Sequence, residues 1–222
     1  MRVAYLILLT AGIAAANVVF SETGTLANST DTKLIDLLLP SSGDVVLQTY
    51  GFGGGTNAAG TVILAGGFDP FVGLFQGVGA GATFVNGTSD ILTSYSPGCP
   101  PAGLVTVGAV TGQCGDVLLQ FTGLSAGNYT VLVSDGSYVP EAVFESAPAF
   151  LGDGFVDLTG GVFQTCADLT DCNTDTGNWA LDITAPDGAS IVSPITTPEP
   201  VLSGFAAAGL AALFFVARLK HR

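Results

Sequence analysis

Residues 117–134 read VLLQFTGLSAGNYTVLVS, and this stretch decides the fold class. Two apolar runs, 118–121 and 129–133, flank a segment that contains Ala126-Gly127-Asn128. Glycine and asparagine adopt the backbone conformations that tight turns require, and runs rich in valine and aromatic residues favour strands. The pattern predicts two adjacent antiparallel strands joined through residues 122–128.

Short apolar runs between turn residues continue along the chain, which contains 31 glycines. Strands are expected at 44–50, 73–75, 83–86, 117–122, 128–134 and 179–184. In the last run, alternation places Trp179, Leu181 and Ile183 on one face. Residues 32–39 (TKLIDLLL) fit a helix, an edge strand or a first strand. The sequence predicts an all-β fold, a jelly-roll-like antiparallel β-sandwich.

The first residues have the layout of a secretory signal peptide. Met1-Arg2 precedes an apolar stretch, 3–16, that ends in Ala14-Ala15-Ala16. Small residues in this arrangement form a cleavage site, so a signal helix over 1–16 and a mature start near Asn17 are expected. A stable membrane helix is the alternative. Residues 17–186 then form the β-sandwich domain, and 187–197 form a linker.

Residues 198–222 have the layout of a membrane-tethering tail. Pro198-Glu199-Pro200 leads into an uncharged apolar run, 201–217. Seventeen helical residues span roughly 25 Å, near the lower limit for crossing a bilayer. The run is followed by a basic stop made of Arg218, Lys220 and Arg222. A single transmembrane helix with a cytoplasmic C-terminus is expected, and a buried core helix is the alternative.

This tail resembles the PEP-CTERM sorting signal of Gram-negative bacteria, in which Pro-Glu-Pro precedes one transmembrane helix and a short basic end. The resemblance covers about 25 residues. It implies that Pro198, Glu199 and Pro200 are recognised by an exosortase-type membrane protease, which removes the tail. The protein would be anchored in the inner membrane in transit and then delivered to the cell surface or extracellular matrix.

The charge distribution excludes several classes of function. The formal net charge is −13, and Lys33 is the one basic residue between positions 17 and 197. Such a surface is repelled by nucleic acid. The sole histidine, His221, lies in the tail, so a Ser-His-Asp triad cannot form in the body. A carboxylate pair of the kind used in glycoside hydrolysis stays open, but no spacing singles one out, and a non-enzymatic protein is expected.

Four cysteines lie in the predicted exported body: Cys99, Cys114, Cys166 and Cys172. An even number in an oxidising compartment predicts two disulfides. Proximity favours Cys99–Cys114 and Cys166–Cys172, although three connectivities are open. A zinc site is the rival, and the spacing without histidine disfavours it.

A second resemblance concerns the body. The segments DVVLQTYGFGGGTNAAGTVILAGGFDPFVGLF (44–75) and LSAGNYTVLVSDGSYVP (124–140) resemble the pre-peptidase C-terminal type of β-sandwich. GDGFVDLTGGVFQT (152–165) and GNWALDIT (177–184) resemble exported bacterial proteins that carry the same tail. The resemblance implies the sandwich fold, but these domains are mostly accessory, so it implies no activity.

Two kinds of binding site can be placed on this sequence. Asp69, between Gly66-Gly67-Phe68 and Pro70, either caps local amides or binds Ca²⁺, with further ligands drawn from Asp90, Asp135, Asp153 and Asp157. No EF-hand pattern is present. A sugar-stacking platform is the other site, with Tyr50, Phe52, Tyr95, Tyr138 and Trp179 as candidates, although Trp179 also fits a core position. An exported surface or matrix protein is expected, which contacts extracellular polysaccharide. The alternative is a carbohydrate-binding or adhesive module that uses Ca²⁺.

Overall fold

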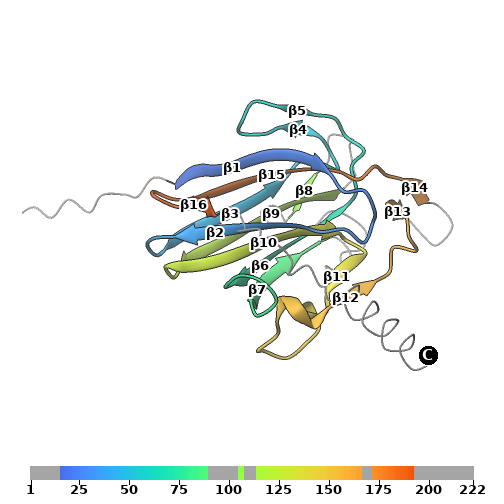
Figure 1. Ribbon diagram of the computed structural model, residues 1–222. Helices are drawn as coiled ribbons and strands as arrows, with labels where there is room; N and C mark the ends of the chain where they lie inside the picture. Colours follow the sequence, from blue (N-terminus) through green and yellow to red (C-terminus); the bar gives the residue numbers. More distant parts are fainter. Residues whose placement is uncertain (1–15, 90–104, 108–113, 167–171, 193–222) are drawn as a thin grey trace, which may run out of the picture. The chain divides into compact units, whose positions relative to one another are not determined.

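Two antiparallel sheets form the protein, whose computed structural model describes residues 16–89, 105–107, 114–166 and 172–192 (Figure 1). Sheet A has the order β1 (Ala16–Thr25), β15 (Asn178–Pro186), β3 (Gly43–Thr49), β9 (Cys114–Leu124) and β8 (Val105–Val107). Sheet B has the order β16 (Ser190–Val192), β2 (Lys33–Leu39), β10 (Gly127–Asp135), β6 (Pro70–Gln76) and β7 (Thr83–Thr88).

Smaller elements lie outside these sheets. Three two-stranded pairs are β4 (Gly55–Thr56) with β5 (Val62–Ile63), β11 (Tyr138–Pro140) with β12 (Phe155–Asp157), and β13 (Gln164–Cys166) with β14 (Cys172–Thr174). Two single-turn 3₁₀ helices, η1 (Glu141–Val143) and η2 (Leu151–Asp153), are the only helices within the described ranges. None of the described helices is long and apolar enough to span a membrane. The predicted helices over 1–16 and 201–217 lie outside the described residues.

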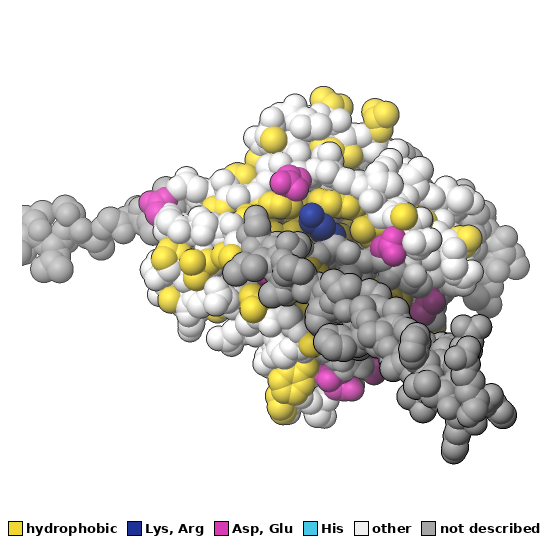
Figure 2. Space-filling view, viewed as in Figure 1, with side chains coloured by type: hydrophobic (Ala, Val, Ile, Leu, Met, Phe, Trp, Pro, Cys, Tyr) yellow, Lys and Arg dark blue, Asp and Glu magenta, His cyan; other side chains and the backbone are white. Residues whose placement is uncertain are grey.

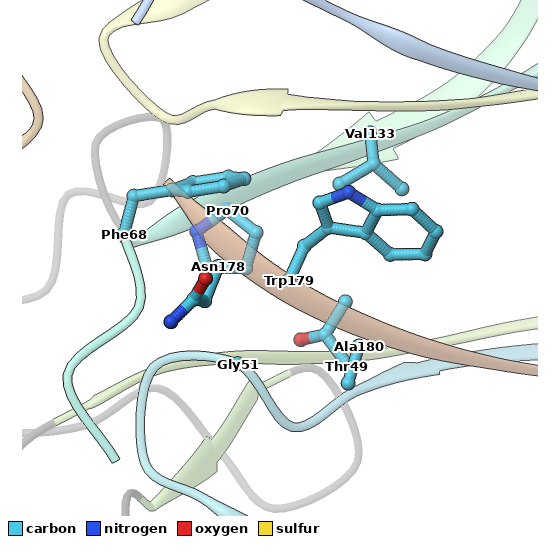
Figure 3. A pocket seen from close by; sticks show the side chains of 8 residues that line it. All are labelled: Thr49, Gly51, Phe68, Pro70, Val133, Asn178, Trp179 and Ala180. Carbon is cyan, nitrogen blue, oxygen red and sulfur yellow. The ribbon is translucent and has the colours of Figure 1, made fainter. Parts of the chain in front are cut away.

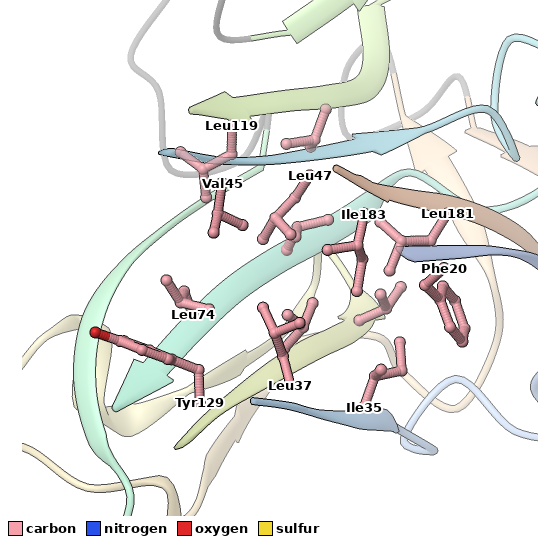
Figure 4. Packing of buried hydrophobic residues seen from close by; sticks show 14 of the residues in the cluster. Phe20, Ile35, Leu37, Val45, Leu47, Leu74, Leu119, Tyr129, Leu181 and Ile183 are labelled. Atoms are coloured by element: carbon pink, nitrogen blue, oxygen red, sulfur yellow. The ribbon is translucent and has the colours of Figure 1, made fainter. Parts of the chain in front are cut away.

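Alternating side chains from both sheets meet in one core (Figure 4). On β2, Ile35, Leu37 and Leu39 are at most 3% exposed, whereas Leu34 and Leu38 on the opposite face are 44% and 36% exposed. This period of two is the signature of a strand with one buried face. Residues 33–39 are therefore a strand, which lies between β16 and β10 in sheet B, and not a helix or an edge strand.

The all-β prediction is confirmed for the described residues, and each of the six predicted strands is present. The prediction that 118–121 and 129–133 pair with each other is wrong. β9 lies between β3 and β8 in sheet A, whereas β10 lies between β2 and β6 in sheet B. Only Ser125 and Ala126 separate the two strands, so the chain passes from sheet A to sheet B through a very short arch.

The arch has a physical basis in the turn residues. Gly123 has a φ of 64° and Gly127 a φ of 152°, values that residues with a side chain rarely adopt. The hydroxyl of Tyr129 donates to the carbonyl oxygen of Ser125 at 2.9 Å and fixes the bend from inside. Both strands thereby place an apolar face on the same core from opposite sides.

Each sheet carries an additional layer on its outer face. The loop 51–67, which contains β4 and β5, is held against sheet A by hydrogen bonds described below. Residues 138–155 cover sheet B, where a second apolar cluster includes Phe71, Phe75, Leu132 and Leu151. The first part of the predicted linker 187–197 belongs to the domain, because β16 pairs with β2 and extends the domain to Val192.

Candidate functional site

The predicted sorting and membrane residues lie beyond the described part of the chain. This applies to Pro198, Glu199 and Pro200 and to Arg218, Lys220 and Arg222. Cys99 and Tyr95 also lie outside the described residues. The sorting hypothesis therefore stays a prediction.

The backbone of β13 and β14 places two of the predicted disulfide cysteines opposite each other. These strands pair with each other, and Cys166 is the register partner of Cys172. Directly opposed residues on antiparallel strands have Cα atoms about 4.5–5.5 Å apart, which lies within the range that a disulfide spans. Cys114 lies at the start of β9, and its proposed partner Cys99 is outside the described residues. Both disulfides stay predictions.

Asp116 is a buried acid that holds the start of the loop 51–67. It is 2% exposed, and its Oδ1 accepts hydrogen bonds from the Thr49 hydroxyl at 3.0 Å and the Phe52 amide at 3.2 Å. Its Oδ2 accepts from the Gly53 amide at 2.7 Å. Burial raises the pKa of Asp116 above its ordinary value, although these hydrogen bonds oppose the rise. The carboxylate thus stabilises backbone donors that the fold removes from water.

Asp182 holds the middle of the same loop. Its Oδ1 accepts from the Ser21 hydroxyl at 2.6 Å, and its Oδ2 accepts from the Ala58 amide at 2.8 Å. Burial, and then the negative charge of Asp182, raises the pKa of Tyr50 to about 12. Asp116, Asp182 and Tyr50 form one polar cluster under an uncharged loop. This cluster was not predicted from the sequence. Its one available signal was an isolated acidic residue inside each of the two apolar strands that carry Asp116 and Asp182.

Several acids meet at the end of sheet B where β10 finishes. Asp135 is 3% exposed and is the register partner of Pro70, and the Gly136 amide donates to the Asp69 carbonyl oxygen at 2.8 Å. Burial raises the pKa of Asp135 to about 6, and the negative charges of Asp175 and Asp157 add to the rise. Asp69, Asp157 and Asp175 therefore all lie near Asp135.

Asp153, another of the predicted calcium ligands, belongs to a different region. It lies in η2, where its carboxylate accepts from the Phe150 amide at 2.5 Å, and it acts electrostatically on Glu145. Asp157 accepts from the amide and the hydroxyl of Thr159 at 2.9 and 2.8 Å. Across the described ranges, no three His, Cys, Asp or Glu side chains are grouped so that they could hold a metal ion. Calcium binding stays a prediction.

The aromatic candidates are largely used for packing. Phe52 and Trp179 are 6% and 7% exposed, and Tyr138 stacks on Phe155 with ring centroids 4.7 Å apart. Lys33 lies over the Trp179 ring, with its Nζ 5.5 Å from the ring centroid. Basic side chains form only a small dark blue patch on the face shown in Figure 2. The core reading of Trp179 is therefore confirmed.

A pocket beside Trp179, whose lining side chains are drawn in Figure 3, is too small to bind a ligand as it stands. Its lining comes from both sheets and includes Phe68, Pro70, Val133 and Asn178. The space between these side chains does not admit a water molecule. It is a packing gap in the core.

No protein-family model matches the sequence, and no curated protein matches it. What the structure defines is a class, an all-β protein built from two antiparallel sheets around a shared core.

Proposed function

We propose that this protein is an exported, non-enzymatic component of the cell surface or extracellular matrix, sorted through a PEP-CTERM tail and processed by an exosortase-type protease. The observation that carries the proposal is the order of features in 198–222: Pro198-Glu199-Pro200, an uncharged run at 201–217, and a basic end. Before processing, the apolar run anchors the protein in the inner membrane.

The body supports a structural role. The pairing of β2 with β10 and of β3 with β9 is nested, as expected of the jelly-roll-like β-sandwich that we propose for the domain. Asp116 and Asp182, the buried acids under the loop 51–67, accept hydrogen bonds from backbone amides. Carboxylates used in this way stabilise loops, and this use favours a structural function over acid–base catalysis.

Replacement of the sorting motif tests the proposal. In a Gram-negative host with an exosortase, the native chain should lose its tail and reach the surface, whereas a Pro198→Ala/Glu199→Ala/Pro200→Ala variant should stay full length in the inner membrane. Val201→Leu is the control, because it changes the adjacent apolar run and leaves the motif intact. Equal processing of native and motif-altered chains would remove the sorting hypothesis.

The second candidate is a carbohydrate-binding or adhesive module that uses Ca²⁺. The specific observation in its favour is that the negative charges of Asp175 and Asp157 act on the buried Asp135, because a bound cation would relieve this repulsion. The described side chains form no ready-made group of three metal ligands, so this candidate requires them to move together when the cation binds. Glycan-array binding with and without a chelator tests it. Binding that needs Ca²⁺ and is lost in Asp157→Asn but kept in Asp153→Asn supports this candidate, and the absence of saturable binding rejects it.

A further inference from the structure

One exposed dipeptide in sheet B has a chemical reactivity that the sorting proposal does not use. Asn86 and Gly87 lie in β7, at one end of the strand order of sheet B among the described strands. Asn86 is exposed. The chain has seven asparagines, and Asn86 is the one that is followed by glycine.

The local geometry brings the reacting groups together. The Gly87 amide donates to Oδ1 of Asn86 at 2.9 Å. The side-chain carbonyl carbon of Asn86 is bonded to that oxygen, so it also lies close to the Gly87 nitrogen. Reactions within a molecule are accelerated when nucleophile and electrophile are already held near contact.

The ladder around Asn86 is irregular. Asn86 pairs with Leu74, whereas Phe84 pairs with Phe75, so Val85 is an extra residue in β7 and forms a bulge. A bulge disrupts the local hydrogen bonds of a ladder, and strands at a sheet edge open more readily than central ones. The backbone at Asn86 can therefore make the rotation that ring closure requires.

The fold also requires the glycine. A Cβ atom at position 87 would come within 2.5 Å of Cζ of Phe71, which is fully buried, and within 3.0 Å of the Val72 carbonyl oxygen. A residue with a side chain at position 87 would hinder the attack of its amide nitrogen on Asn86. Packing against Phe71 excludes such a residue at this position. Core packing thus leaves an unhindered nitrogen next to an exposed asparagine.

We propose that Asn86-Gly87 is a site of spontaneous deamidation in the folded protein. The Gly87 nitrogen loses its proton and attacks the side-chain carbonyl carbon of Asn86. The bond from that carbon to the side-chain nitrogen breaks, and ammonia leaves with the proton. Water then opens the cyclic imide at either carbonyl carbon, and the product is an aspartyl or isoaspartyl residue at position 86.

The product changes the edge of the sheet. Either form adds a negative charge to β7, and charge on an edge strand opposes pairing with another strand. The isoaspartyl form also adds one carbon to the main chain next to the bulge. The modification therefore marks the age of the protein and weakens the pairing of β7 with β6.

Peptide mapping by mass spectrometry tests the proposal on the purified full-length protein, incubated folded at mildly alkaline pH. The mass gain of an amide-to-acid conversion is expected at Asn86 on the order of tenfold faster than at Asn128, which is also exposed and is followed by Tyr129. The product should accept methylation by an isoaspartyl methyltransferase.

The variant Asn86→Gln is the matched control, because its longer side chain closes a less favoured ring, and it should show no gain at this position. A gain at Asn86 no faster than at Asn128 would overturn the proposal. So would a gain that occurs only after unfolding in urea, because the folded strand would then be protecting the site.

Discussion

Asp116 and Asp182 show how single acids position a whole loop. Both lie in strands of sheet A, and both accept backbone amides from the loop 51–67. The loop has no charged residue of its own and is rich in glycine. Its conformation therefore depends on acceptors that the sheet supplies.

Replacing Asp116 with asparagine should destabilise the fold. The amide keeps one acceptor oxygen but turns an NH₂ group toward the Gly53 amide, and a buried donor left without an acceptor costs about 1–3 kcal/mol. Urea denaturation measures the change in unfolding free energy. Asp44→Asn is the control, because Asp44 also accepts a backbone amide, that of Gly123, but at an exposed site. Equal losses in both variants would contradict the role of burial.

Asp135 should make stability depend on pH in an unusual direction. Its pKa rises from an ordinary 3.8 to about 6 in the fold, so the folded state binds the proton more tightly than the unfolded state. Its contribution to the free energy of unfolding, about 3 kcal/mol, is fully present below about pH 4. This contribution is lost as pH rises through about 6. Thermal unfolding of the native chain and Asp135→Asn between pH 4 and 7 measures it. Parallel pH profiles would reject this assignment.

At the scale of elements, strand β2 offers a matched pair of leucines. Leu37 is 1% exposed and faces the core, whereas its neighbour Leu38 is 36% exposed. Leu37→Ala should lower the unfolding free energy by about 2–5 kcal/mol, because it removes apolar contacts and leaves a cavity. Leu38→Ala should lower it much less. Chemical denaturation compares the two, and similar losses would show that the faces of β2 are assigned incorrectly.

The β13–β14 pair should be closed by a disulfide. Because Cys166 and Cys172 are register partners, we expect them to be linked to each other in the exported protein. A loop this short contributes about 2 kcal/mol through the unfolded state. Peptide mapping without reductant identifies the linkage, and a Cys166→Ser/Cys172→Ser variant measures the stability. Recovery of Cys166 linked to Cys99 or Cys114 would contradict the pairing.

The elements could be predicted from the sequence because their signal is local. Alternation in Trp179, Leu181 and Ile183, for example, indicates a strand and its core face without reference to any partner. The pairing of β9 with β3 and of β10 with β2 could not be predicted, because ladder partners are distant in sequence and a short connection ordinarily indicates a hairpin.

For the candidate sites too, the spatial neighbours of single residues could not be predicted from local sequence. The turn predicted around Asp69 is not present, because Asp69 lies directly before β6, and its proximity to Asp135 depends on the pairing of β6 with β10. The separation of Asp153 from Asp157 depends on the turn of η2 and the course of β12. Neither arrangement has a local signal.

At the scale of the whole molecule, the described domain covers sheet A with a loop held by hydrogen bonds and sheet B with a segment held by apolar packing. The loop 51–67 lies over sheet A, and residues 138–155 bury Phe71, Phe75 and Leu132 on sheet B. Beyond this domain lies the segment 198–222, which we propose as a sorting signal and membrane anchor. With that tail removed, the domain would suit the structural role at the cell surface that we propose.

The mass of the protein recovered from the cell surface tests this account most directly. The account predicts a chain that begins near Asn17 and ends before the apolar run 201–217. A surface-exposed protein that retains the residues through Arg222 would contradict it.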